Sequence, residues 1–305
     1  MPTVTQSVFP VMGNTADVTV VGSDHLIEFA HSLLQQLEQL WSRFIPTSEI
    51  SQLNNAAGKA TKVSPHTIQL VKYLVGAYES TNEAFDPTLL PVLIDIGYGS
   101  SFSHPERQSL LHNESSWGIP LSEIRIDEEK QQVQIPAGLT LDPGGLGKGL
   151  AADILATELI NRGATGACVS IGGDIRCIGQ SPQGDFWTIP IETPFATSET
   201  ETISFTQGGI ATSWLHAKTW STPAGVQHHI LNPKTRLPLT SADSSLVQTT
   251  VIANEAVWAE IYATALLVSG SEIMFPIIDS FGVAAQVIDH SGKVLVSKHW
   301  KEFSL

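Results

Sequence analysis

The chain has 305 residues, with 16 Lys and Arg against 30 Asp and Glu, which gives a formal charge of −14 at pH 7 and a pI near 5.0. Such an acidic chain repels polyphosphate backbones, which disfavours general nucleic-acid binding and binding to membrane surfaces through basic residues. Hydrophobic residues make up 42% of the sequence and charged residues 15%, which is enough apolar mass for a core and excludes wholesale disorder.

Cysteine usage, the N-terminus and the lengths of the apolar stretches predict a soluble protein without a disulfide framework. Cys168 and Cys177 are too few for a disulfide framework or a four-ligand zinc site, and each lies in an apolar run, which predicts a small buried side chain. The N-terminal segment has neither a basic region nor a long apolar core, so we expect no signal peptide. No stretch approaches twenty apolar residues, so we expect no membrane span and, by default, a cytoplasmic location.

The N-terminal part is predicted to form two strands and a long helix. Residues 5–21 have the pattern of strand, turn and strand, with the turn near Met12 and valines that favour strands. From Ser23 the apolar spacing becomes that of an amphipathic helix that extends to Phe44, with Ser23 or Asp24 as its N-cap.

The next segments combine loops, a helix and a hairpin. Residues 46–55 are predicted to form a polar loop. A second helix begins at Ser64, which is expected to cap it, with Pro65 in the first turn. Residues 81–105 contain a turn-rich segment, and residues 121–141 are expected to contain a short hairpin.

A glycine-rich run divides a predicted strand from a predicted helix. The strand covers residues 139–141 and leads directly into the run at 142–149. A helix follows at about 150–162, and Gly163 is expected to end it. Residues 167–171 then have the composition of a buried strand.

The C-terminal half is predicted to be mostly sheet with one major helix. Residues 186–220 alternate like sheet strands, Asn254 is predicted to cap the last major helix, and strands are expected near 283–288 and 293–297. We find no fixed repeat and no low-complexity linker. The whole chain, 1–305, is therefore expected to form a single domain of the α/β (α+β) class, a layered sheet flanked by helices.

The glycine-rich run, DPGGLGKG from Asp142 to Gly149, is the strongest local sign of chemistry. Four glycines ahead of a helix present backbone N–H groups to an anion, and the helix dipole assists them. Lys148 adds a charge suited to phosphate, and Asp142 can bind a hydroxyl or an amide edge. The run matches neither GxxxxGK[ST] nor GxGxxG. A tight turn with one surface lysine therefore stays open as the alternative.

Three weaker patterns follow. The turn 172–174 can bring backbone close to a ligand or can be a plain β-turn. Glu260 and Thr264 share one helix face, where they could ligate Mg²⁺, or they could form a solvated face with a threonine bonded into its own turn. His228 and His229 precede a turn, and strand alternation lets only one of them face a pocket. Either histidine can also be purely structural.

Taken together and in order, these segments resemble the ApbE family of FAD:protein FMN transferases. The resemblance covers nearly the whole chain, from Met12 to about Gly270. The matching segments are Met12-Gly13, Ser48-Glu49-Ile50-Ser51 with Leu53-Asn54, Phe85-Asp86-Pro87-Thr88, Asp142 to Gly149 with Asp153, Gly172-Gly173-Asp174-Ile175-Arg176, Ala211-Thr212-Ser213, His229 to Thr235, and Ala263-Thr264-Ala265.

The resemblance implies a T-fold-like globule and a flavin chemistry. Members of the family bind FAD and Mg²⁺ and transfer the FMN half to a threonine or serine hydroxyl of a target flavoprotein, and AMP leaves. Some members instead hydrolyse FAD to FMN and AMP. Splitting a pyrophosphate requires neutralisation of charge at the phosphate oxygens, which a metal and a lysine supply, and the attacking hydroxyl needs a base.

The resemblance also implies site residues by motif position. His229, rather than His228, would be the base near the acceptor. A backbone carbonyl of the glycine-rich run, such as that of Gly145, would hold Mg²⁺ together with Glu260 and Thr264. The flavin nucleotide would contact Met12, Phe44, Phe85, Asp86, Pro87, Asp142, Lys148 and Ile230.

Four positions depart from the family pattern. Glu260 stands where the family usually has Asp, and Trp214 stands where it has Gly. Asn232 replaces an Asp and Arg236 replaces a Gly, so a positive φ at Arg236 is either no longer needed or strained. All four lie where metal and acceptor should bind. A flavin-binding protein that has lost transfer, and an FAD pyrophosphatase, therefore stay open as alternatives.

Overall fold

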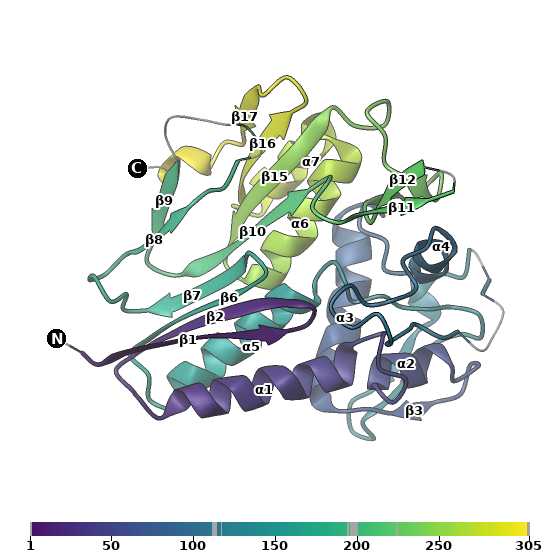
Figure 1. The fold of residues 1–305 in the computed structure, drawn as a ribbon, viewed down its shortest axis with the longest axis horizontal. Helices are drawn as coiled ribbons and strands as arrows, with labels where there is room; N and C mark the ends of the chain where they lie inside the picture. The colour runs from purple at the N-terminus through teal and green to yellow at the C-terminus, as the bar shows by residue number, and fades with distance from the viewer. Residues whose placement is uncertain are drawn as a thin grey trace.

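A large antiparallel sheet organises the computed structural model, which describes residues 2–111, 115–116, 118–193, 195, 201–223 and 225–303 (Figure 1). Its eight strands lie in the order β1-β2-β6-β7-β10-β15-β16-β17, and all neighbouring pairs are antiparallel. The strands are β1 Val4–Val11, β2 Asn14–Val21, β6 Gly166–Ile171, β7 Asp174–Gly179, β10 Gly208–Trp214, β15 Leu246–Ala253, β16 Ala284–Asp289 and β17 Val294–Val296.

Helices pack on one face of this sheet and enclose the main core (Figure 1). Because strand side chains alternate between the two faces, Val18 and Val20 of β2 and Val169 of β6 all point into this core. Fully buried leucines of the helices, such as Leu34 and Leu155, belong to the same cluster. The helices are α1 Leu26–Trp41, α5 Gly147–Asn161, α6 Ala256–Ser269 and α7 Ser271–Ser280. The expected α/β (α+β) class is thus confirmed.

A smaller core lies on the opposite face, against the hairpin of β8 Trp187–Pro190 and β9 Thr202–Phe205. Cys177 belongs to this core and lies opposite Cys168 in the β6–β7 pair, with the two Sγ atoms 3.2 Å apart. Both cysteines are free thiols. The prediction of a small buried side chain holds for Cys177, whereas Cys168 is only half-buried.

A second group of elements lies beside the sheet (Figure 1). Its helices are α2 Glu49–Asn54, α3 Pro65–Ser80 and α4 Leu90–Asp95. Its strands form a sheet of β3 Thr61–Lys62, β5 Gln132–Gln134 and β4 Arg125–Asp127, and the hairpins of β11 Thr219–Thr222 with β12 Gly225–His228 and of β13 Leu231–Asn232 with β14 Leu237–Pro238.

The remaining helical segments are short 3₁₀ helices at Leu121–Glu123 and Trp300–Glu302. No helix in the ranges described is long and apolar enough to cross a membrane.

The two long N-terminal helices differ in their caps. The cap position of α1 is His25, which makes no side-chain cap hydrogen bond, so the predicted capping by Ser23 or Asp24 is wrong. Ser64 does cap α3 as predicted, because its hydroxyl accepts a hydrogen bond from the Thr67 amide at 3.3 Å. For α1, packing of the apolar face therefore stabilises the helix more than capping of the first turn does.

Three short helices, α2, α4 and α7, were not predicted. The segment 46–55, expected as a polar loop, contains α2, which begins after Ser48; the Ser48 hydroxyl accepts a hydrogen bond from the Ser51 amide at 3.1 Å. Six residues are too few to show a helical period. Helix α7 follows Gly270, which looks like a helix end, and it contains Pro276, which looks like a break.

A carboxylate from another helix caps α6. The prediction that Asn254 is the cap is wrong, because α6 begins at Ala256 and no side chain at its own cap position makes a cap hydrogen bond. Instead, Asp153 of α5 accepts hydrogen bonds from the amides of Ala256 and Val257 at 2.9 and 2.8 Å. Arg176 lies 3.3 Å from the same carboxylate. This contact fixes the start of α6 against α5.

The predicted strand 139–141 is wrong, although the hairpin before it is confirmed as β4 and β5. The Asn54 side chain donates to the Leu141 carbonyl at 2.9 Å and accepts from the Leu141 amide at 2.8 Å. A side chain thus satisfies the backbone groups that a strand partner would otherwise bind. The predicted strands of 186–220 appear as β8 to β11, apart from positions 194 and 196–200, which lie outside the described residues.

Candidate active site

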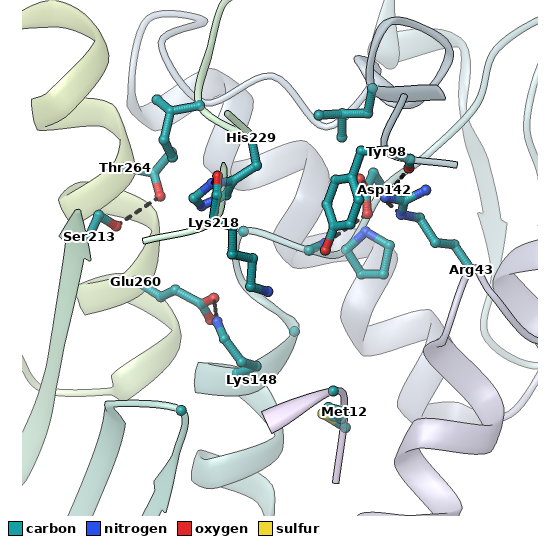
Figure 2. A pocket seen from close by; sticks show the side chains of 18 of the residues that line it. Met12, Arg43, Tyr98, Asp142, Lys148, Ser213, Lys218, His229, Glu260 and Thr264 are labelled. Carbon is teal, nitrogen blue, oxygen red and sulfur yellow. Dashed lines mark hydrogen bonds and ion pairs between the residues drawn. The ribbon is translucent and has the colours of Figure 1, made fainter. Parts of the chain in front are cut away.

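A cavity of about 400 Å³ lies where the sheet meets the second group of elements, and its size is typical of small-molecule sites. Every site residue implied by the sequence lines it. These residues are Met12, Phe44, Phe85, Asp86, Pro87, Asp142, Gly145, Lys148, His229, Ile230, Glu260 and Thr264. Figure 2 shows that those it labels, such as Met12, Lys148 and Glu260, come from segments far apart in the chain.

Two hairpin turns form one edge of the cavity. Met12 and Gly13 join β1 to β2 with φ values of 51° and 68°, and Gly172 and Gly173 join β6 to β7 with 60° and 95°. Two left-handed residues in a two-residue turn suit the right-handed twist of the strands. A Cβ on Gly172 would lie 2.7 Å from the Asn14 side chain, so the two turns are in direct contact. Met12 holds a strained backbone conformation at the cavity wall.

The start of the glycine-rich segment is fixed to the loop that carries Asp86. The Asp142 amide donates to the Pro87 carbonyl at 2.8 Å, and a Cβ on Gly145 would lie 2.7 Å from the Phe85 ring. Only glycine allows that approach. Asp86 accepts hydrogen bonds from the amide and hydroxyl of Thr88 at 2.8 and 2.7 Å. Burial raises the pKa of Asp86, and these hydrogen bonds oppose the rise.

The second half of the glycine-rich segment is the first turn of α5. This helix begins at Gly147, earlier than the predicted residue 150. The Gly149 amide donates to Glu260 Oε2 at 2.8 Å, and a Cβ on Gly149 would lie 2.6 Å from the Ala256 carbonyl oxygen. The anion bound by this amide is therefore the protein's own Glu260 carboxylate.

Lys148 lies between two buried carboxylates, those of Asp174 and Glu260. Figure 2 shows its contact with Glu260. Its Nζ lies 2.5 Å from Asp174 Oδ2 and contacts Glu260 Oε1, and each of the two carboxylate side chains is 5% exposed. Burial favours the neutral amine, but the charges of Asp174 and Glu260 outweigh it and raise the pKa of Lys148. Burial, followed by the charge of Glu260, raises the pKa of Asp174 to about 7. Glu260 thus points toward the glycine-rich segment and not to solvent.

Arg43 is a cavity residue that the sequence reasoning missed. Its Nε lies 3.6 Å from Asp142 Oδ2, and its two terminal nitrogens donate to the Ser109 hydroxyl at 2.8 Å and the Tyr98 carbonyl at 3.0 Å. The guanidinium also lies 4.2 and 4.6 Å from the ring centres of Phe44 and Tyr98. Its position next to Phe44 was the one available signal. Arg43 holds Asp142 and the aromatic wall of the cavity together.

His229 and His228 point to different places. His229 lines the cavity just beyond β12, and its Nδ1 lies 3.4 Å from the Lys218 carbonyl oxygen. Burial, and next the charge of Lys218, lower the pKa of His229 to about 3. His228 is buried away from the cavity lining, with Nε2 2.8 Å from the Leu239 carbonyl oxygen. Donation from Nδ1 of His229 to the carbonyl would leave Nε2 as an acceptor.

The candidate metal ligands supply oxygen donors of the kind that Mg²⁺ prefers. Gly145, Ser213, Glu260 and Thr264 all line the cavity, and the hydroxyls of Ser213 and Thr264 are 3.3 Å apart. Ser213 was not predicted as a ligand. No group of three or more His, Cys, Asp or Glu suited to a metal occurs in the part of the chain that the structure describes. The oxygen atoms of these residues are of the type that binds Mg²⁺. The Lys148 ammonium would compete with Mg²⁺ for the Glu260 carboxylate.

The departures from the family pattern have identifiable structural effects. Arg236 keeps the left-handed conformation of the glycine it replaces, with φ of 58°, and is therefore strained. Asn232 accepts from the amide of Lys234 at 3.0 Å and donates to Asp243 Oδ1 at 2.9 Å, so a nearby carboxylate retains the local negative charge. Trp214 lines the cavity, whereas Arg236 is exposed outside its lining.

Comparison with known proteins agrees with this arrangement. The profile of the ApbE family matches residues 12–287, and the chain belongs to this family. A protein named FAD:protein FMN transferase from Vibrio cholerae is 26% identical over 309 residues, covering 96% of this chain and 91% of the relative. One of the same name from Haemophilus influenzae is 25% identical over 292 residues, covering 92% and 83%.

Solved structures confirm the fold. The crystal structure of the ApbE protein from Thermotoga maritima aligns with a TM-score of 0.83 and 21% identity, covering 99% of this chain and 100% of that one. The flavin transferase ApbE from Vibrio cholerae aligns with a TM-score of 0.82 and 23% identity, covering 99% and 100%. The expected ApbE-like fold is therefore correct.

Proposed function

We propose that this protein is an FAD:protein FMN transferase that moves the FMN half of FAD to a threonine or serine hydroxyl of a target flavoprotein and releases AMP. The names of its relatives support flavin transfer. The observation that carries the proposal is the cavity itself, which combines an aromatic wall at Phe44 and Tyr98 with the cluster of Lys148, Asp174 and Glu260. One side suits flavin rings and the other suits a diphosphate with a cation.

The protein groups divide the work of such a transfer. The aromatic wall and Met12 would hold the isoalloxazine, while Asp142, fixed by Arg43, would bind a hydroxyl or amide edge. His229 would accept the proton of the attacking hydroxyl through Nε2. A phosphorus–oxygen bond then forms to the acceptor hydroxyl as the bond to the AMP oxygen breaks. Bound Mg²⁺, held by Glu260, Thr264 and the Gly145 carbonyl, would neutralise charge on the phosphates.

Mass spectrometry tests the proposal directly. The protein is mixed with FAD, Mg²⁺ and a peptide that bears a candidate acceptor threonine, with a matched peptide carrying valine in its place. We expect the threonine peptide to gain the mass of FMN less water, together with AMP in solution. AMP and free FMN without any peptide adduct would instead indicate a pyrophosphatase. FAD binding without AMP release would indicate a flavin-binding protein that has lost transfer.

A further inference from the structure

The cationic side chains of the cavity are not equally available to a ligand. Among the described lining residues these are Arg43, Arg107, Lys148 and Lys218. Lys148 is held by Asp174 and Glu260, and Arg43 lies beside Asp142. The two acidic side chains therefore compensate the positive charge of Lys148 within the protein. That cluster alone offers no uncompensated positive charge to a diphosphate.

Lys218 extends from beside His229 into the cavity toward Lys148 (Figure 2). Within the described ranges, no carboxylate oxygen lies within 4.0 Å of its Nζ. Burial and the neighbouring charge of Lys148 lower the pKa of Lys218. A cation held in a cavity beside a second cation, with no acid in contact, is placed to receive an anion.

The position of Lys218 is fixed by the β11–β12 hairpin. Thr219 pairs with His228 at the end of this hairpin, so Lys218 and His229 face each other one position further along. The hydrogen bond between His229 Nδ1 and the Lys218 carbonyl closes the pair. One hairpin therefore delivers both an ammonium and an imidazole to the same wall of the cavity.

We propose that Lys218 binds the phosphate groups of the substrate, while the charge of Lys148 is already compensated within the protein. This assignment rests on the proposed function, because it takes FAD as the occupant. Lys218 adds a positive charge that no carboxylate in contact compensates, and this charge favours binding of a diphosphate. The position was not singled out in the sequence, where Lys218 is an isolated lysine between strand-like residues.

Binding titrations with and without phosphate on the ligand test the assignment. Flavin fluorescence is measured for FAD and for riboflavin, which has no phosphate, against the unmodified protein, Lys218→Met and Lys218→Arg, in buffer with EDTA and without acceptor. The exposed Lys293→Met serves as a matched control. We expect Lys218→Met to weaken FAD binding about tenfold or more, with a smaller dependence on salt, and to leave riboflavin binding unchanged.

The conservative variant and the melting temperature separate binding from structure. Lys218→Arg should keep FAD affinity within about threefold, because it keeps the charge. Lys218→Met without ligand should melt no lower than the unmodified protein, because the buried cation it removes is repelled by Lys148. Equal losses for FAD and riboflavin, or unchanged FAD affinity, would overturn the assignment. Lys218-dependent FAD binding without any FMN transfer would leave it standing and overturn the proposed function instead.

Discussion

At the scale of single residues, the polar and charged side chains of the cavity are paired with groups of the protein itself. Lys148 is held by Asp174 and Glu260, Asp142 by Arg43, and His229 by the Lys218 carbonyl. A substitution at one member leaves a buried partner uncompensated, which costs more than the lost contact itself. The pairings also explain why the cavity tolerates Glu260 in place of Asp. The longer side chain reaches both Lys148 and the Gly149 amide.

Protonation of His229 should destabilise the fold. A base whose pKa falls from about 6.5 when unfolded to about 3 when folded binds its proton more tightly in the unfolded chain. The contribution of His229 to stability is therefore full above pH 6.5 and is lost as the pH falls below that value, by about 2 kcal/mol at pH 5. Urea unfolding at pH 7 and pH 5 measures this contribution by comparison of variants, because the raised pKa of Asp174 changes stability in the opposite direction. It should shrink in His229→Gln and persist in the exposed control His25→Gln; the same loss in both variants would contradict the assignment.

The two adjacent histidines should differ in catalysis. His229 lines the cavity, whereas His228 is buried beside Leu239. We expect His229→Ala to lower AMP release from FAD with acceptor by about a hundredfold or more, as loss of a general base does, and His228→Ala to retain most of the rate once folded. Initial rates with Mg²⁺ decide between them. Equal losses, or a loss with His228→Ala alone, would show that His229 is not the base.

At the scale of elements, the contact between α5 and α6 positions Glu260 and Thr264. Asp153 satisfies two amides at the start of α6, and Gly149 lets the helices approach closely. We expect Asp153→Ala to lower the free energy of unfolding by about 1 to 3 kcal/mol at pH 8, where the carboxylate is charged. Chemical denaturation measures this, with the exposed Thr157→Ala on the same helix as control. Similar small losses in the two variants would show that the cap is not a major contributor.

The cysteine pair offers a test of the sheet register. In the β6–β7 hairpin, Ile171 pairs with Asp174 across a two-residue turn, which makes Cys168 and Cys177 a closely spaced pair. We expect oxidation with diamide, a thiol oxidant that takes up the two hydrogens, to join them in one intramolecular disulfide. Peptide mapping detects it, and Cys168→Ser is the control. A register one residue different would leave both thiols free or give intermolecular dimers only.

The sequence allowed prediction of elements with a clear period but not of those fixed by distant side chains. The β4–β5 hairpin and the capping of α3 by Ser64 follow from local residues and were correct. The cap of α6 lies on α5, and the extended segment before Asp142 is held by Asn54, so neither is visible in a local window. Motif order selected residues that all line one cavity, while Lys218 was missed because its position in the cavity depends on the β11–β12 pairing.

At the scale of the whole molecule, the cavity joins two parts of the structure. Its walls combine the hairpin turns of the main sheet with the segments around Phe85, Tyr98 and His229. A ligand bound there contacts both parts at once, so it should stabilise the folded protein as a unit. At a hundred times its dissociation constant, FAD should add about 2.7 kcal/mol and raise the melting temperature by several degrees.

Hydrogen exchange can show where that stabilisation acts and whether it needs the metal. We expect FAD with Mg²⁺ to slow exchange at residues 84–89, 142–149 and 229–231, which belong to both walls, and to leave the remote β16–β17 turn unchanged. EDTA should remove the slowing of exchange around α6 that depends on Mg²⁺ bound by Glu260. Glu260→Gln should show the same loss without EDTA, because a neutral amide binds Mg²⁺ poorly. If EDTA changes neither the exchange nor the melting temperature with FAD bound, Glu260 serves only as the partner of Lys148 and Gly149. The proposal that Glu260 and Thr264 hold a metal would then be wrong.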